Sequence, residues 1–131
     1  MSDQITFDPR PQVVTDGAGS RVLGSLCEGC GYPILDAAAL CCPRCRSTDL
    51  GQAEFGPWGT VWSSTTIRFP LPGRTPPYDV AYVDLDDGPR LLVHIEGDGG
   101  APVDSRVRLT GATESGDVRG SVEGTAPMER P

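Results

Sequence analysis

The sequence predicts a mainly β protein in which a small cysteine-containing module precedes a five-stranded barrel. Two closely spaced Cys-x-x-Cys pairs near the start indicate the module, and short alternating segments after residue 56 indicate the barrel. The 17 glycines and 13 prolines among 131 residues favour turns and short strands over long helices. We expect a flexible arm, the cysteine module, the barrel domain and a flexible tail, at residues 1–20, 21–56, 57–124 and 125–131.

The cysteine pairs have the spacing of a metal site. Eleven residues separate Cys27–Cys30 from Cys42–Cys45, enough for a short hairpin that brings the two pairs together. Each pair forms a tight knuckle with two thiolates, and four thiolates at tetrahedral corners are the ligand set of a closed structural Zn²⁺ site. The sequence therefore predicts a zinc ribbon whose ligands are Cys27, Cys30, Cys42 and Cys45.

Other interpretations of these cysteines have less support from the sequence. The odd total of five, with a polar N-terminal sequence that predicts no signal peptide, favours metal binding over disulfides. A thioredoxin-like redox pair requires a βαβ context that the pattern lacks. Iron in a rubredoxin-like site uses the same four sulfurs and stays open as an alternative. Cys41 replaces Cys42 only if its knuckle stretches to Cys-x-x-x-Cys, so we interpret Cys41 as a spare thiol.

Charge argues against one class of partner. Eighteen acidic residues against eleven basic ones, all arginine, give a net charge of −7. Nucleic-acid-binding proteins usually carry a basic surface, which a chain this acidic lacks. No apolar run approaches the roughly 20 residues that span a membrane. We expect a cytoplasmic protein with no nucleic-acid partner and no membrane span.

Five segments after residue 56 have strand character, because they alternate apolar and polar residues or are rich in β-branched ones. They lie at residues 60–69, 79–85, 90–96, 105–111 and 118–122. In the first segment, the odd-numbered residues from Val61 to Phe69 are predicted to face inward. The same alternation predicts inward positions for Ala81, Val83 and Leu85 in the second segment and for Val107 and Leu109 in the fourth. Five short strands without a convincing helix favour an OB-fold, with an SH3-like barrel as the alternative. Short strands are also expected in the zinc ribbon, at residues 21–26 and 32–35.

Several motifs in this order resemble a known family. They are Cys27–Cys30 followed by Gly31, then Cys42–Cys45, and then residues 59–63, 77–85, 87–92 and 104–108. Together they resemble small bacterial and archaeal proteins in which a rubredoxin-like zinc ribbon precedes an OB-fold, and which accompany thiolases and thiolase-like acyl-CoA enzymes. The resemblance covers residues 22–112. It departs from the family in residues 1–20, which lack the usual helical hairpin, and in residues 33–41 between the knuckles.

The resemblance implies a non-catalytic accessory subunit. Such a subunit binds and stabilises a thiolase-fold partner in a hetero-oligomer and helps to form its acyl-CoA site. The partner would be a thiolase, an acyltransferase or a steroid side-chain aldolase. The alternative is a stand-alone acyl-CoA or lipid binding module.

Exposed apolar residues suggest where a partner would bind. Trp62 faces outward by strand parity, and tryptophan is enriched at interface hot spots. We expect the interface near Trp58, Trp62 and the loop from Leu71 to Pro77. Arginines on these strands would meet CoA phosphates, or pair with acidic neighbours.

The sequence offers no convincing catalytic centre, and we predict no catalytic residue. The only histidine, His94, alternates with the inward residues of its strand and is expected to be exposed. A general base needs a positioned partner and a pocket, neither of which the sequence indicates. Asp84, Asp86 and Asp87 adjoin a Gly-Pro turn and are interpreted as solvated turn residues.

Overall fold

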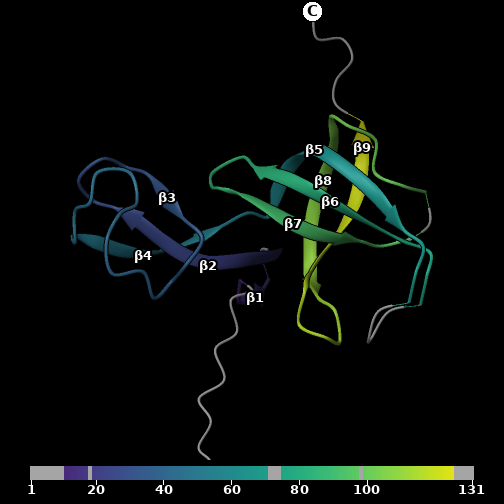
Figure 1. The fold of residues 1–131 in the computed structure, drawn as a ribbon, viewed down its shortest axis with the longest axis horizontal. Coiled ribbons are helices and arrows are strands. Elements are labelled where there is room, and N and C mark those ends of the chain that lie inside the picture. Colours follow the sequence, from purple (N-terminus) through teal and green to yellow (C-terminus); the bar gives the residue numbers. More distant parts are fainter. Residues whose placement is uncertain (1–10, 18, 71–74, 98, 126–131) are drawn as a thin grey trace, which may run out of the picture.

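The described part of the chain is built from β-strands (Figure 1). The computed structural model describes residues 11–17, 19–70, 75–97 and 99–125, and none of these lies in a helix. The strands form a four-stranded sheet and a closed barrel, which Figure 1 shows as two lobes. The predicted fold class, mainly β with a five-stranded barrel after a cysteine module, is confirmed.

The N-terminal sheet is organised around β2 (Gly19–Cys27). The strands β1 (Val13–Asp16) and β3 (Pro33–Ile34) pair with one edge of β2, and β4 (Leu50–Phe55) pairs with the other, all antiparallel. The sequence indicates short strands within β2 and around β3, but not β1 or β4. Residues 13–16, inside the expected arm, therefore form a hairpin with β2. The rest of that arm before residue 11, and the tail from residue 126, lie outside the described residues.

The second lobe is a closed barrel with strand order β5-β6-β7-β9-β8. All neighbouring strands are antiparallel except β7 and β9, which run parallel. These strands coincide closely with the five predicted segments, and their number and closure are those of an OB-type barrel. They are β5 (Trp58–Ile67), β6 (Tyr78–Leu85), β7 (Arg90–Ile95), β8 (Ser105–Ala112) and β9 (Val118–Thr125).

The barrel interior is filled as the alternation predicts. Ala81, Val83 and Leu85 of β6 are buried, as are Val107 and Leu109 of β8. Together with apolar residues of β5, β7 and β9 they form one hydrophobic cluster. Burial of this cluster is the main term that stabilises so small a barrel, at about 25 cal/mol per Å² of apolar surface.

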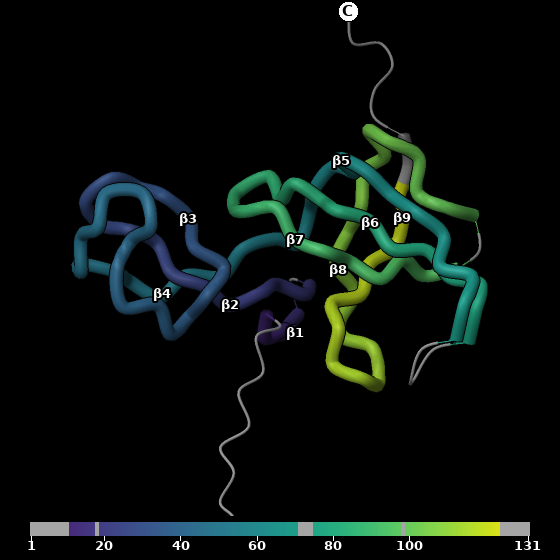
Figure 2. Tube along the Cα trace, in the orientation of Figure 1, coloured from purple at the N-terminus to yellow at the C-terminus, as the bar shows by residue number. Residues whose placement is uncertain are grey.

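Two side chains of the N-terminal sheet belong to the same cluster. Val22 of β2 is fully buried, and Phe55 at the end of β4 is 3% exposed. The β6–β7 turn closes over Phe55, since a Cβ added to Gly88 would lie 2.6 Å from that side chain. Asp87 in this turn accepts a 2.9 Å hydrogen bond from the backbone N–H of Gly56. The sheet is thus packed on the barrel, at the point where Figure 2 traces β4 into β5.

The predicted inward face of β5 is wrong beyond Val61. A β-bulge between Val61 and Ser63 shifts the register against β6, so strict alternation does not continue along the strand. Val61 is buried, whereas Thr65 is exposed and Phe69, beyond the strand, is 59% exposed. A bulge inserts one residue and changes the parity of everything after it, which an alternation pattern does not indicate.

Candidate metal centre and interaction face

The two cysteine pairs form matching knuckles. In the first, the N–H of Gly31 donates a 2.8 Å hydrogen bond to the carbonyl of Cys27, and in the second Arg46 donates one of 2.8 Å to Cys42. Gly31 and Arg46 each follow the second cysteine of a pair and have left-handed backbones, with φ of 80° and 70°. Each knuckle therefore turns both of its thiols to the same side. The first knuckle begins at the last residue of β2, which anchors it to the sheet.

The four predicted ligands lie together. The Sγ atoms of Cys27, Cys30, Cys42 and Cys45 all fall within 4.8 Å of one another. The Sγ separations are 3.5 Å for Cys27 and Cys45, and 3.7 Å for Cys30 and Cys42. A tetrahedral site with Zn–S bonds of about 2.3 Å has edges of about 3.8 Å. These residues fit a four-thiolate metal site, and the fifth cysteine, Cys41, is exposed and outside the group.

Backbone N–H groups favour thiolates in this cluster. The N–H of Cys30 lies 3.4 Å from the Cys27 sulfur and lowers the pKa of that thiol. Burial, the largest influence on Cys42, favours its neutral form, but the N–H groups of Cys45 and Arg44 outweigh it and lower the pKa to about 6. A thiolate is the form of cysteine that binds metal.

Hydrogen bonding between the sulfurs acts against full ionisation. The N–H of Ser47 favours the Cys45 thiolate, but the neighbouring sulfurs of Cys27 and Cys30 outweigh it and raise the pKa of Cys45 to about 12. Four thiolates at these separations need a cation to offset their charge. The donor set is therefore suited to a divalent metal ion.

The predicted interface residues that the structure describes lie along β5 and just before β6. On β5, Trp62 is 53% exposed and Trp58 is 37% exposed, and Pro77 is exposed at the start of β6. Pro77 precedes Tyr78, which pairs with Ile67 at the far end of β5 from Trp58. Leu71 lies outside the described residues.

Other exposed side chains gather around Trp62. Its neighbours are Tyr82 on β6 and, beyond it, Leu92 on β7, which are 46% and 42% exposed. The sequence analysis did not predict Leu92 as part of this face. Its even-numbered position, directly opposite Tyr82 in the register, places it on the same outer face of the barrel as Tyr82.

The arginines near this face are paired. Arg90 binds Asp84 through two hydrogen bonds of 2.6 and 3.2 Å. Arg106 binds Asp86 through two of 2.9 and 2.7 Å, so two of the three aspartates near the β6–β7 turn hold arginines. Arg106 in turn lowers the pKa of the Asp86 carboxyl, mainly through this hydrogen bonding.

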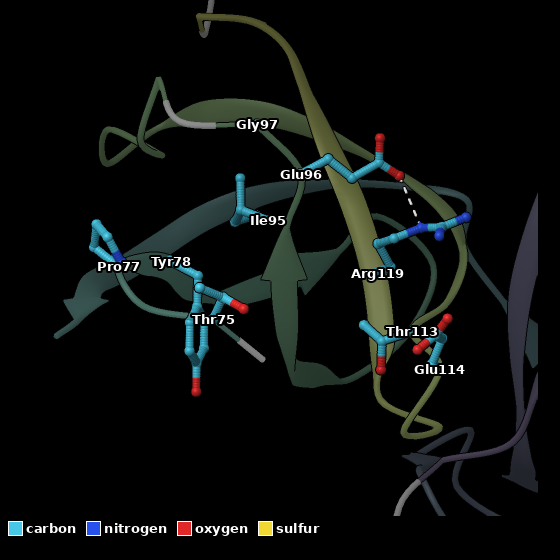
Figure 3. A pocket seen from close by; sticks show the side chains of 9 residues that line it. All are labelled: Thr75, Pro77, Tyr78, Ile95, Glu96, Gly97, Thr113, Glu114 and Arg119. Atoms are coloured by element: carbon cyan, nitrogen blue, oxygen red, sulfur yellow. Dashed lines mark ion pairs between the residues drawn. The ribbon is translucent and has the colours of Figure 1, made fainter. Parts of the chain in front are cut away.

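A cavity of about 410 Å³ opens at the end of the barrel near the start of β6 and the β8–β9 turn. Figure 3 shows Arg119 pointing toward Glu96, and the two form an ion pair with a 2.8 Å Nε–Oε2 distance. Glu114 adds a second carboxylate to the lining. The side chains that line the cavity thus carry two acidic groups and one arginine that is already paired.

His94 is not exposed, contrary to the prediction. Its side chain is 12% exposed, because its ring stacks on Tyr78 with centroids 5.8 Å apart. Its Nε2 lies 3.7 Å from an Asp117 carboxylate oxygen. The parallel pairing of β7 with β9 places Asp117 there, and local alternation does not indicate such a contact.

Comparison with known proteins finds a family model that is similar to part of this chain. Residues 52–112 match the family model described as ChsH2, C-terminal OB-fold domain. These residues, just under half of the chain, are similar to that OB-fold domain. The family resemblance predicted from the sequence is thereby confirmed.

Two curated relatives of this chain are named as enzyme subunits. One is benzoylsuccinyl-CoA thiolase subunit BbsA of Geobacter metallireducens, 31% identical over 87 residues, which are 66% of this chain and 58% of that protein. The other is named "Probable enoyl-CoA hydratase alpha subunit" in Thermomonospora curvata and is 31% identical over 97 residues, 68% of this chain and 30% of that protein. The chain thus spans less than two thirds of the length of either relative.

Solved structures agree on the fold. The Ltp2-ChsH2(DUF35) aldolase structure superposes with a TM-score of 0.64 at 25% identity, covering 78% of this chain and 84% of that one. A DUF35-family protein of unknown function from Sulfolobus solfataricus gives a TM-score of 0.58 at 22% identity, covering 79% and 76%, and shows the fold alone. Among the described residues, no helix is long and apolar enough to cross a membrane.

Proposed function

We propose that this chain is a non-catalytic, metal-binding accessory subunit of a thiolase-fold enzyme that acts on acyl-CoA. The observation that carries the proposal is the match to the ChsH2 OB-fold domain model, together with a relative named as a thiolase subunit and a similar chain in the Ltp2-ChsH2(DUF35) aldolase structure. The chain binds and stabilises its partner and helps to form the acyl-CoA site. The partner is a thiolase, an acyltransferase or a steroid side-chain aldolase.

The metal has a structural role in this proposal. Cys27, Cys30, Cys42 and Cys45 would hold Zn²⁺, which supplies a cross-link between the knuckles and no catalytic chemistry, since four thiolates leave no open coordination position. The same four sulfurs accept iron, so metal analysis decides the ion. Because Cys27 ends β2 and Val22 of that strand lies in the barrel core, the cross-link also fixes the sheet that packs on the barrel.

The alternative, a stand-alone acyl-CoA binding module, rests on the 410 Å³ cavity beside the β5–β6 and β8–β9 loops, where OB-folds commonly bind ligands. The charge of the residues that line this cavity disfavours acyl-CoA binding. Glu96 and Glu114 oppose a polyanion, and Arg119 is already paired with Glu96. We therefore favour the accessory subunit.

Activity and stability measurements test the proposal. The purified chain is mixed in turn with each thiolase-fold acyl-CoA enzyme of the source organism, and acyl-CoA turnover and that enzyme's unfolding free energy are measured. A chain present at 100 times its Kd should stabilise the partner by about 2.7 kcal/mol. The isolated chain should show no turnover. Enzyme-like turnover by the chain alone, or no effect on the partner, contradicts the proposal.

A further inference from the structure

Three exposed apolar side chains form a continuous strip across the outer face of the barrel. Tyr82 is directly opposite Ser63, which follows Trp62, and on its other side is directly opposite Leu92. Their exposed fractions are 53% for Trp62, 46% for Tyr82 and 42% for Leu92. We propose that this strip, the outer β5–β7 face, is the docking surface for an apolar, uncharged segment of the partner subunit. The inference rests on the proposed function and names the surface that performs it.

The Trp62 side chain, at the β5 end of the strip, is held in place before any partner arrives. The Arg90 guanidinium carbon lies 3.8 Å from the centroid of the Trp62 ring, and Asp84 fixes that guanidinium through two hydrogen bonds. Tyr82 meets the Trp62 ring edge-on, with centroids 6.4 Å apart and an interplanar angle of 71°. A preordered side chain loses little entropy on binding, so more of its contact energy appears as affinity.

Two hollows flank the strip and offer places for partner side chains. A hollow of about 90 Å³ is lined by Val80, Ala81, Tyr82 and Leu92, together with polar residues of β5. A second, of about 120 Å³, lies on the other side of Leu92 and is lined mainly by apolar residues of the barrel and of the N-terminal sheet. Both exceed the share of one water, about 30 Å³. Apolar anchors that fill such hollows are typical of interface hot spots.

Charge pairing on and beside this face selects the kind of occupant. Arg90 is bound to Asp84, Arg106 to Asp86, and His94 lies 3.7 Å from Asp117. A polyanion such as the CoA phosphates or a nucleic acid would have to displace these carboxylates, in a chain of net charge −7. An uncharged apolar protein segment leaves every pair intact. The face is therefore complementary to a protein partner and unsuited to a phosphate ligand.

Calorimetric titration with the thiolase-fold acyl-CoA enzyme that the chain stabilises tests the proposal. Trp62→Ala should raise the Kd roughly thirtyfold, since a hot-spot tryptophan contributes about 2 kcal/mol or more. Leu92→Asp places a charge in the strip and should weaken binding at least as much. The matched controls are Phe69→Ala and Val103→Asp, whose side chains are 59% and 60% exposed and belong to neither the strip nor its hollows, and they should change the Kd less than twofold.

Circular dichroism and thermal unfolding establish that each variant is folded, and two independent substitutions guard against a local folding defect. If the wild-type chain binds the partner and both strip variants bind equally well, this inference is overturned while the proposed function stands. If the wild-type chain does not bind at all, the proposed function itself fails. If Leu92→Asp abolishes self-association of the chain and leaves partner binding unchanged, the occupant of the strip is a second copy of this chain. If CoA binds the chain and the strip variants weaken that binding, the occupant is a phosphate ligand. Either result overturns the proposal.

Discussion

Gly31 and Arg46 occupy equivalent positions in the two knuckles, with φ of 80° and 70°. Each donates its N–H to the carbonyl of the first cysteine of its pair. A glycine adopts this conformation without strain, and an arginine adopts it at a cost of order 1 kcal/mol or more. That a non-glycine residue is held there indicates that the second knuckle is fixed by its surroundings, as expected if a metal ion binds both knuckles.

Metal analysis should find about one zinc per chain, with Cys42 as a ligand and Cys41 not. Cys42→Ser should lose the bound zinc and make residues 21–56 sensitive to protease, because the knuckles lose their cross-link. Cys41→Ser is the adjacent control and should keep the full metal content, since Cys41 is exposed and outside the cluster. Zinc retained by Cys42→Ser and lost by Cys41→Ser would reverse the ligand assignment.

Phe55 should be a main contributor to the packing of the N-terminal sheet on the barrel. Phe55→Ala removes a side chain that is 3% exposed and should lower the unfolding free energy by about 3–5 kcal/mol. Phe69→Ala removes the same group where it is 59% exposed, and the change should stay within about 0.5 kcal/mol. Urea unfolding measures both, and equal effects would show that Phe55 does not join the lobes.

Gly59 is required by close approach of the neighbouring strand. A Cβ at this position would lie 2.6 Å from Val83 Cγ1 and 2.7 Å from the Asp84 carbonyl oxygen. Gly59→Ala should therefore destabilise the barrel by about 1–3 kcal/mol through overpacking. Gly99→Ala is the control, because nothing lies within 4 Å of its Cβ position. Thermal unfolding compares them, and a Gly59→Ala protein as stable as wild type would contradict the close packing of β5 on β6.

The Asp86–Arg106 pair should give stability a small dependence on pH. Arg106 lowers the folded-state pKa of Asp86, so the stabilisation is present above the unfolded pKa of about 3.9 and is lost as pH falls through the folded value. Asp86→Asn should cost at most about 1 kcal/mol at pH 7, since both side chains are partly exposed, and the difference from wild type should vanish in acid. A difference that grows on acidification would give the opposite sign and refute the pairing.

The barrel strands could be predicted from local patterns because, along each strand, residues that face the buried interior alternate with residues that face outward. Val83 and Val107 lie inside as their parity requires. The pattern failed where non-local geometry intervenes, at the bulge after Val61 and at His94, which is covered by Tyr78 from a different strand.

In the N-terminal sheet, β4 was not predicted from the sequence, because it contains Gly51, Gln52 and Glu54 and owes its conformation to pairing with β2. The cysteine cluster is the converse case. Two short motifs place four sulfurs with little dependence on the rest of the chain, so Cys27 and Cys42 were correctly brought together from spacing alone. The exposed strip depends on the register of three strands, and the sequence analysis predicted only its Trp62 as an interface residue.

The most direct test of the central claim is the mass of the species formed when the chain is expressed together with each thiolase-fold acyl-CoA enzyme of the source organism. Size-exclusion chromatography with light scattering should detect a hetero-oligomer containing both proteins in a fixed ratio. Separate elution of the two proteins at concentrations well above 1 μM, with each at its own mass, would contradict the claim that this chain is an accessory subunit.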